Sequence, residues 1–115
     1  MDGAVGFYAP DGVWDASPWG MGVFEGHGAI RGFFEDWRSS YSGIDWTAEE
    51  IRDLGNEVTF AVILQKASVV GSTAPTQLRY AAVTEWSDGL IVHNTTYTDI
   101  DEARAAAERL AGERG

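Results

Sequence analysis

The sequence has no cysteine, only two histidines, and eight Lys and Arg residues against eighteen Asp and Glu. Without thiols, a disulfide scaffold, a cysteine zinc site and a thiol nucleophile are excluded. Two histidines leave little for a multi-histidine metal centre. The net charge of −10 argues against nucleic-acid binding and against docking on anionic membranes, because both need clustered Lys and Arg. We therefore expect no nucleic acid, no membrane, no metal and no organic cofactor.

Long apolar runs are also missing. None approaches the roughly 20 residues that span a bilayer. The N-terminal MDGAVGFYAP lacks the basic flank and continuous apolar stretch of a secretory signal. The length suits one domain. We expect residues 1–115 to form a single cytoplasmic domain.

Aromatic residues, in contrast, are abundant, with five Trp, five Phe and four Tyr in 115 residues. Each buried ring removes about 150–250 Å² from water, so a substantial core is available. A small core rarely needs so many large rings to fill its volume. Either some rings line a cavity, or some lie under a subunit interface.

The N-terminal part predicts short elements followed by one long helix. Residues 2–9 favour a short helix, 10–12 a turn, and 13–25 a hairpin around a Pro/Gly loop. A helix is expected from about 27 to 42, ended by Gly43. Its apolar stripe has the spacing i, i+3, i+4, i+7 and i+11, formed by Ile30, Phe33, Phe34, Trp37 and Tyr41.

From residue 45 onward the apolar period changes to two. Such alternation is typical of strands, expected over 46–54, 57–69, 78–86 and 90–98. Ser87-Asp88-Gly89 is a strong hairpin signal, and adjoining hairpins imply an antiparallel meander. A C-terminal helix over 99–112, capped by Asp99, is rich in alanine and therefore predicted to be peripheral.

Three segments resemble a known family: VWDASPWGMGVFEGHGAIRGFFEDW (13–37), IRDLGNEV (51–58) and LRYAAVTEWSDGLIVHNTTYTDIDEARAAA (78–107). They are similar to the SnoaL-like branch of the nuclear transport factor 2-like superfamily, which includes polyketide cyclases and ketosteroid isomerase. The resemblance implies an α+β fold, a curved antiparallel sheet wrapped around a long helix in a cone-like, cystatin-type α+β roll. It is weak for function, because the fold hosts enzymes, binders and assembly domains.

Members of this family usually carry a longer helix before the segment that starts this chain. We expect that first N-terminal helix to be lacking, so that the cone is open or closed by a partner. Apolar residues expected on the outer sheet face, Ala81, Val83, Ile91 and Tyr97, favour a homodimer through that face.

Asp15 is the candidate catalytic residue. It lies among Val13, Trp14 and Trp19, where poor solvation would raise its pKa and suit a general base. The resemblance places it near the general base of ketosteroid isomerase and the acid/base of the SnoaL-type cyclases. The alternative is a loop aspartate that accepts backbone N–H groups around Ser17.

Steroid isomerisation itself is not expected. The resemblance puts Ala82 where the isomerase has a protonated aspartic acid, and the tyrosine donor belongs to the helix that this chain is expected to lack. Other side chains are expected to line a pocket for a small hydrophobic organic ligand. They are Trp14, Trp19, Tyr80, Thr84, Trp86, Asn94 and Thr96.

Two functions follow from these residues. One is ligand binding with isomerase- or cyclase-type proton transfer through Asp15. The other is a non-catalytic ligand-binding or dimerisation module of the same fold. The missing oxyanion donors favour the second, and the clustering of Asp15 with aromatic residues supports the first.

Overall fold

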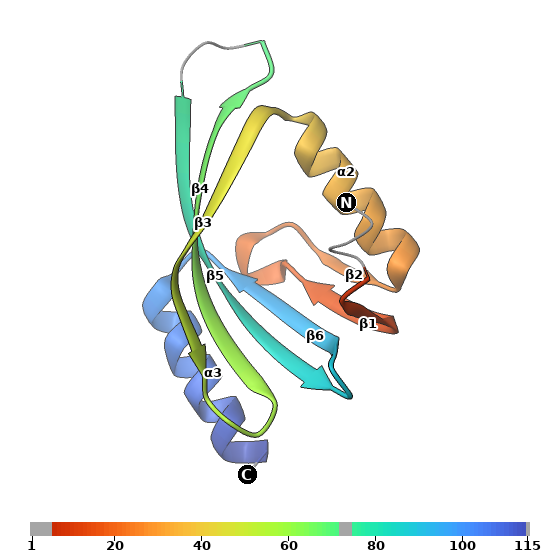
Figure 1. Ribbon diagram of the computed structural model, residues 1–115, viewed down its shortest axis with the longest axis vertical. Coiled ribbons are helices and arrows are strands. Elements are labelled where there is room, and N and C mark those ends of the chain that lie inside the picture. Colours follow the sequence, from red (N-terminus) through yellow and green to blue (C-terminus); the bar gives the residue numbers. More distant parts are fainter. Residues whose placement is uncertain (1–5, 72–74, 115) are drawn as a thin grey trace.

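The computed structural model describes residues 6–71 and 75–114, which form one curved sheet with a helix on each face (Figure 1). In chain order the elements are β1 (Tyr8–Asp15), the 3-10 turn η1 (Ser17–Trp19), β2 (Val23–Glu25), α2 (His27–Ser39), β3 (Tyr41–Asp53), β4 (Val58–Val69), β5 (Pro75–Ser87), β6 (Leu90–Tyr97) and α3 (Ile100–Arg114). Helix α2 crosses the concave face, and α3 lies against the convex face. The predicted α+β architecture is confirmed, and the sheet remains open.

The strand order is β2-β1-β6-β5-β4-β3. Strands β3 to β6 form the predicted antiparallel meander. The turn between β5 and β6 has Asp88 and Gly89 at φ 53° and 79°, which is the left-handed geometry of a two-residue hairpin. Strand β1, however, pairs with β6 in parallel, so the sheet is mixed.

The N-terminal strand corrects two expectations. β1 begins at Tyr8, within the predicted helix 2–9, and residues 1–5 lie outside the described part of the chain. The turn expected at 10–12 is an irregularity inside β1, because the register with β6 shifts between Tyr8 and Val13. The predicted hairpin is confirmed by the antiparallel pairing of β1 with β2.

The end of α2 also differs from the prediction. The helix stops at Ser39, and the N–H of Ser40 bonds the carbonyl of Trp37. Tyr41 fits the helical spacing but begins β3; its ring still contacts Trp37, with centroids 5.5 Å apart. Gly43, at φ 68°, lies at a register shift of β3 instead of ending the helix.

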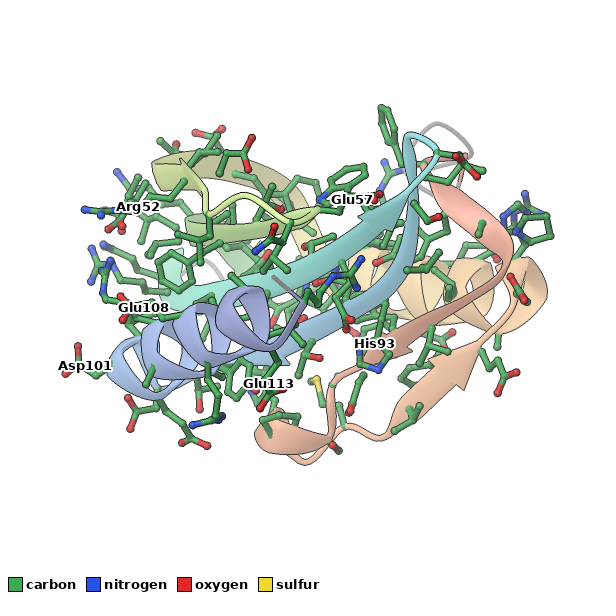
Figure 2. All side chains as sticks on the ribbon, turned by 90° about the horizontal axis from the view of Figure 1, so that it is seen from below. Arg52, Glu57, His93, Asp101, Glu108 and Glu113 are labelled. Atoms are coloured by element: carbon green, nitrogen blue, oxygen red, sulfur yellow. The ribbon has the colours of Figure 1, made fainter. Side chains whose placement is uncertain are left out.

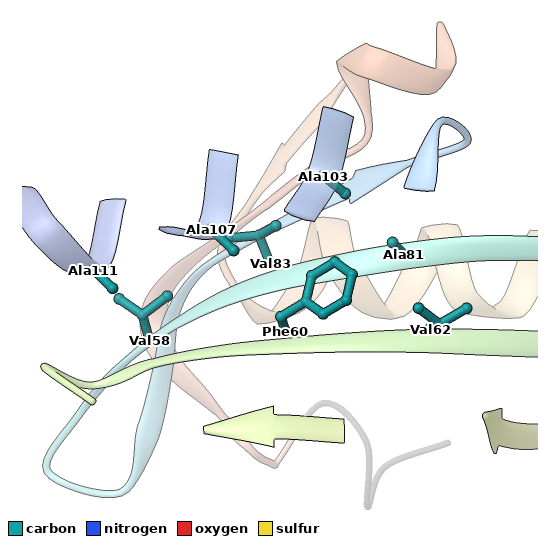
Figure 3. Packing of buried hydrophobic residues seen from close by; sticks show 8 residues of the cluster. All are labelled: Val58, Phe60, Val62, Ala81, Val83, Ala103, Ala107 and Ala111. Atoms are coloured by element: carbon teal, nitrogen blue, oxygen red, sulfur yellow. The ribbon is translucent and has the colours of Figure 1, made fainter. Parts of the chain in front are cut away.

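The convex face of the sheet is closely packed under α3 (Figure 3). The buried cluster consists of Val58, Phe60, Val62, Ala81 and Val83 from the strands and Ala103, Ala107 and Ala111 from the helix. Alanine methyl groups let the helix backbone approach the strands closely. The alanine-rich helix predicted to be peripheral therefore closes one half of the core.

Polar contacts hold α3 in place. The N–H of Glu102 bonds Oδ1 of Asp99 at 3.0 Å, which confirms the predicted cap. Arg104 donates two hydrogen bonds to Glu50, at 2.7 and 3.0 Å, and lies 4.8 Å from the ring centroid of Phe60. The helix also carries exposed acidic side chains, including Asp101, Glu108 and Glu113 (Figure 2). Within the described ranges, neither helix is long and apolar enough to cross a membrane.

Candidate functional site

A cavity of about 340 Å³ lies between α2 and the concave face of the sheet. Seven of its lining side chains are aromatic: Trp14, Trp19, Phe33, Phe34, Trp37, Trp46 and Tyr80. Ala16, Met21, Ile63 and Ala82 complete the apolar wall, and Asn94 and Thr96 are polar. None of these described lining residues carries a charge, so the cavity is an apolar, aromatic space.

Strand alternation decides which side chains reach this cavity. Successive residues of a strand point to opposite faces. On β5, Tyr80 and Ala82 therefore line the cavity, whereas Ala81 and Val83 pack under α3. The alternation with period two in the sequence therefore predicts which residues of β5 lie on each face of the sheet.

The aromatic rings hold one another in place. Trp14 meets Phe33 edge-on, with centroids 4.6 Å apart. Trp19 contacts Trp37 at 5.3 Å and Tyr80 at 5.4 Å. Each such pair contributes about 0.5–1.5 kcal/mol beyond its buried area. The walls are therefore ordered by ring contacts between η1, α2, β1 and β5.

The indole N–H groups of three wall residues are already bonded to the protein. Gln65, in β4 and only 1% exposed, accepts N–H groups from Trp37 and Trp46 through Oε1, each at 2.9 Å. Trp14 donates its N–H to Thr96 Oγ1 at 2.7 Å. These tryptophans therefore offer ring surface to a ligand.

Polar groups that can meet a ligand are Tyr80, Thr96 and Asn94. Burial raises the pKa of Tyr80 to about 12, although a hydrogen bond from Trp46 opposes the rise, so the phenol stays protonated and can donate. Asn94 donates one amide N–H to Tyr8 Oη at 2.9 Å and retains a second. The hydroxyl of Thr96 accepts from an indole and keeps its own hydrogen. The polar part of the cavity is thus rich in donors.

Asp15 lies on the other face of its strand. Its neighbours Trp14 and Ala16 line the cavity, and its Oδ1 accepts hydrogen bonds from the backbone N–H of Ser17 at 2.9 Å and from the Ser17 hydroxyl at 2.5 Å. The hydroxyl bond, the largest effect, lowers the pKa of Asp15, with a smaller contribution from His93. The predicted rise in this pKa is wrong, because the bonds from Ser17 outweigh partial burial.

Of the seven predicted ligand-binding residues, five surround the cavity: Trp14, Trp19, Tyr80, Asn94 and Thr96. Thr84 is buried outside the lining and donates to Asn94 Oδ1 at 3.3 Å. Trp86 packs against the cluster of Tyr8, Ile30 and Ile91 and donates its N–H to Thr59 at 2.9 Å. The structure therefore brings five of the candidates together and places two beyond the cavity.

Sequence reasoning missed several wall residues, among them the rings of α2, and also Gln65, which bonds two of the wall's indoles. The rings of α2 were expected only as an apolar stripe, and Gln65 only as an alternating strand residue. The available signal was a single amide in the apolar strand VTFAVILQ, since a buried amide requires partners. The residues around Gln65 in the sequence do not indicate that its partners are Trp37 and Trp46, because both lie far away along the chain.

The four apolar residues expected on an outer face available for a homodimer lie elsewhere in the structure: three pack with α3 and one lies on the concave side. Ala81 and Val83 are buried by α3, and Tyr97 packs against the same cluster. Ile91 lies on the concave side against Ile30, because the register of β5 and β6 shifts by one residue there. Placing Ile91 on the outer face is therefore wrong, and homodimerisation stays a prediction.

In the part of the chain that the structure describes, no group of three His, Asp or Glu side chains lies close enough together to hold a metal ion. The cavity has neither a charged lining residue nor a described metal-ligand cluster, so its chemistry is that of apolar surface and neutral hydrogen-bond groups.

A curved sheet around a helix, with an apolar cavity between them, defines the cone-like α+β class of nuclear transport factor 2-like proteins. The chain belongs to the SnoaL-like domain family, whose family model matches residues 1–94. No curated protein matches the chain.

Solved structures share this fold. A protein with a ketosteroid isomerase-like fold from Catenulispora acidiphila, in complex with trimethylamine, has a TM-score of 0.74 and 14% identity over 90% of this chain and 78% of its own. An NTF2-like protein of unknown function from Burkholderia pseudomallei has a TM-score of 0.73 and 20% identity, over 92% of this chain and 83% of its own. TerC, co-crystallised with polyporic acid, has a TM-score of 0.72 and 16% identity, over 94% of this chain and 85% of its own. At these identities the likeness establishes the fold alone.

Proposed function

We propose that the cavity binds a small, largely apolar organic molecule with a flat body of about two fused rings. The observation that carries this proposal is the uncharged aromatic lining of a 340 Å³ space. An apolar cavity of about 150 Å³ holds a benzene molecule, so roughly twice that volume suits two rings. Apolar walls with a few polar groups are the usual form of small-molecule sites.

The polar groups favour a ligand that carries a hydrogen-bond acceptor. Tyr80, Thr96 and Asn94 each have a hydrogen to donate, and Thr96 already uses its oxygen as an acceptor. A carbonyl oxygen at one end of the ligand matches this arrangement. A ligand with only donor groups would leave these hydrogens unbonded.

Binding is favoured over proton transfer by Asp15. Its carboxylate is held by Ser17 on the side of β1 away from the cavity, and its lowered pKa makes it a weak base. Proteins of this fold have been crystallised with molecules as different as trimethylamine and polyporic acid. The ligand class must therefore be argued from this chain's own walls.

The proposal is tested by titrating the protein with 2-acetylnaphthalene while tryptophan fluorescence is recorded. We expect saturable binding that Ala82→Phe weakens by about tenfold or more, because the new ring occupies the cavity. Ala105→Phe, on an exposed position of α3, is the matched control and retains affinity. Absence of binding to the unaltered protein, or full affinity in Ala82→Phe, contradicts the proposal.

Asp15→Asn separates binding from proton transfer. We expect the affinity for 2-acetylnaphthalene to stay within about twofold of the unaltered protein, because the carboxylate does not line the cavity. The same titration measures it. A tenfold loss of affinity, or conversion of a ketone substrate that depends on Asp15, would instead favour the acid/base function.

A further inference from the structure

We infer that Gln65 is the positioning residue of the cavity: it fixes Trp37 and Trp46 as one wall that takes the apolar end of the ligand. This inference rests on the proposed function. The side chain is buried, and its single carbonyl oxygen receives indole N–H groups from two separate elements, α2 and β3.

The placement of Gln65 explains how one amide can reach both rings. On β4 it lies directly opposite Trp46 of β3, on the concave face. Trp37 reaches the same oxygen from the last part of α2. A carbonyl oxygen has two lone pairs, and both are occupied here. The two indoles are held at fixed positions while neither N–H remains for a ligand.

The wall therefore orients the bound molecule. At the end formed by Trp37 and Trp46 the ligand meets ring surface whose N–H groups are satisfied, and the phenol of Tyr80 beside Trp46 is the one donor of the three at that end. At the other end, on β6, Asn94 and Thr96 offer donors. Strands β3 and β6 are separated by β4 and β5, so Trp46 and the two β6 donors belong to strands three spacings apart in the sheet. A carbonyl on the ligand points toward β6.

The indole N–H region of a ¹⁵N-correlated NMR spectrum tests this assignment, because the chain has five tryptophans. Gln65→Met keeps an unbranched chain of similar length and removes the acceptor. We expect the Trp37 and Trp46 signals to move and the affinity for 2-ethylnaphthalene, an acceptor-free probe, to fall about tenfold. Gln65→Glu keeps a carbonyl oxygen, since a buried carboxyl stays protonated, and restores both.

Thr59→Val is the matched control. It removes the acceptor of Trp86, an indole outside the cavity, so only the Trp86 signal should move and the affinity should stay unchanged. If Gln65→Met binds 2-ethylnaphthalene as tightly as the unaltered protein, the inference is overturned and the proposed function stands. If the unaltered protein binds neither naphthalene probe, both are overturned.

Should Gln65→Met fail to fold, exchange with D₂O in the unaltered protein supplies the test. With saturating 2-acetylnaphthalene, the N–H groups of Trp37 and Trp46 remain protected because Gln65 keeps them, and the amide signal of Asn94 shifts because the ketone lies there. Rapid exchange of both indoles, or a ketone bonded to either of them, overturns the inference.

Discussion

The two faces of the sheet are built from the same strands and packed in opposite ways. On the convex face, small aliphatic side chains meet the alanines of α3 (Figure 3). On the concave face, large rings from both α2 and the strands meet one another and line a cavity. Small side chains let a helix lie close to the strands, whereas rings on both sides keep the helix away from the sheet.

This contrast separates stability from ligand binding within each strand. Because alternate residues point to opposite faces, Ala81 supports the core while Ala82, the next residue, lines the cavity. A closely packed interior gains dispersion contacts that the walls of an empty space forgo. The convex face is therefore expected to contribute most of the stability, and the concave face most of the specificity.

Removal of one ring from each face gives the largest expected effect. Phe60, 1% exposed and under Arg104, is central to the convex cluster, so Phe60→Ala should lower the free energy of unfolding by about 3–5 kcal/mol. Phe33→Ala, which enlarges an existing cavity, should cost roughly half as much, because this half-buried ring loses fewer contacts. Urea unfolding measures both. Equal losses would remove the contrast between the faces.

Enlarging neighbouring alanines sharpens the comparison. Ala81→Leu overpacks the buried convex face and should lower the free energy of unfolding by about 1–3 kcal/mol. Ala82→Leu extends into the cavity and should change stability by less than about 0.5 kcal/mol, while it weakens ligand binding. Denaturant unfolding and the fluorescence titration report the two effects. A destabilising Ala82→Leu would mean that the cavity is closed to added volume.

These faces could be predicted where a regular strand encodes them. The alternation over 78–86 assigned Val83 to one side and Tyr80 to the other, because period two is a property of the chain itself. The expectation for Ile91 failed, since a one-residue register shift reverses the faces and leaves no mark in composition.

The candidate site was predictable only in part, for a related reason. Trp14 and Asn94 could be placed from their own strands, but the wall at Gln65 depends on partners from α2 and β3. The raised pKa expected for Asp15 assumed an apolar environment read from its sequence neighbours. In a strand the adjacent Trp14 points to the opposite face, so its ring says little about the surroundings of the carboxylate.

The smallest expected effect is an acid-induced loss of stability on the convex face, where Glu50 bonds Arg104 of α3. The hydrogen bond from Arg104 is the main cause that lowers the pKa of Glu50 from 4.5 to about 2, and Arg52 contributes. A pKa depressed in the folded state gives stability that is present above pH 4.5 and lost as pH falls toward 2. The carboxylate is exposed to solvent, so the loss should be small and confined to the anchoring of α3.

Amide exchange of α3 between pH 5 and pH 2 measures this loss. Glu50→Gln should speed exchange in α3 at pH 5 and reduce its acid dependence in this range. Glu49 lies next to Glu50 on β3 and forms an ion pair with Arg79 of β5. Glu49→Gln, which breaks this pair, is the matched control and should leave α3 unchanged. Binding of 2-acetylnaphthalene should be the same in both variants, because the described cavity lining holds no acid and Tyr80 titrates near pH 12. A cavity that loses affinity along with α3 protection would show that the two faces are coupled through the strands they share.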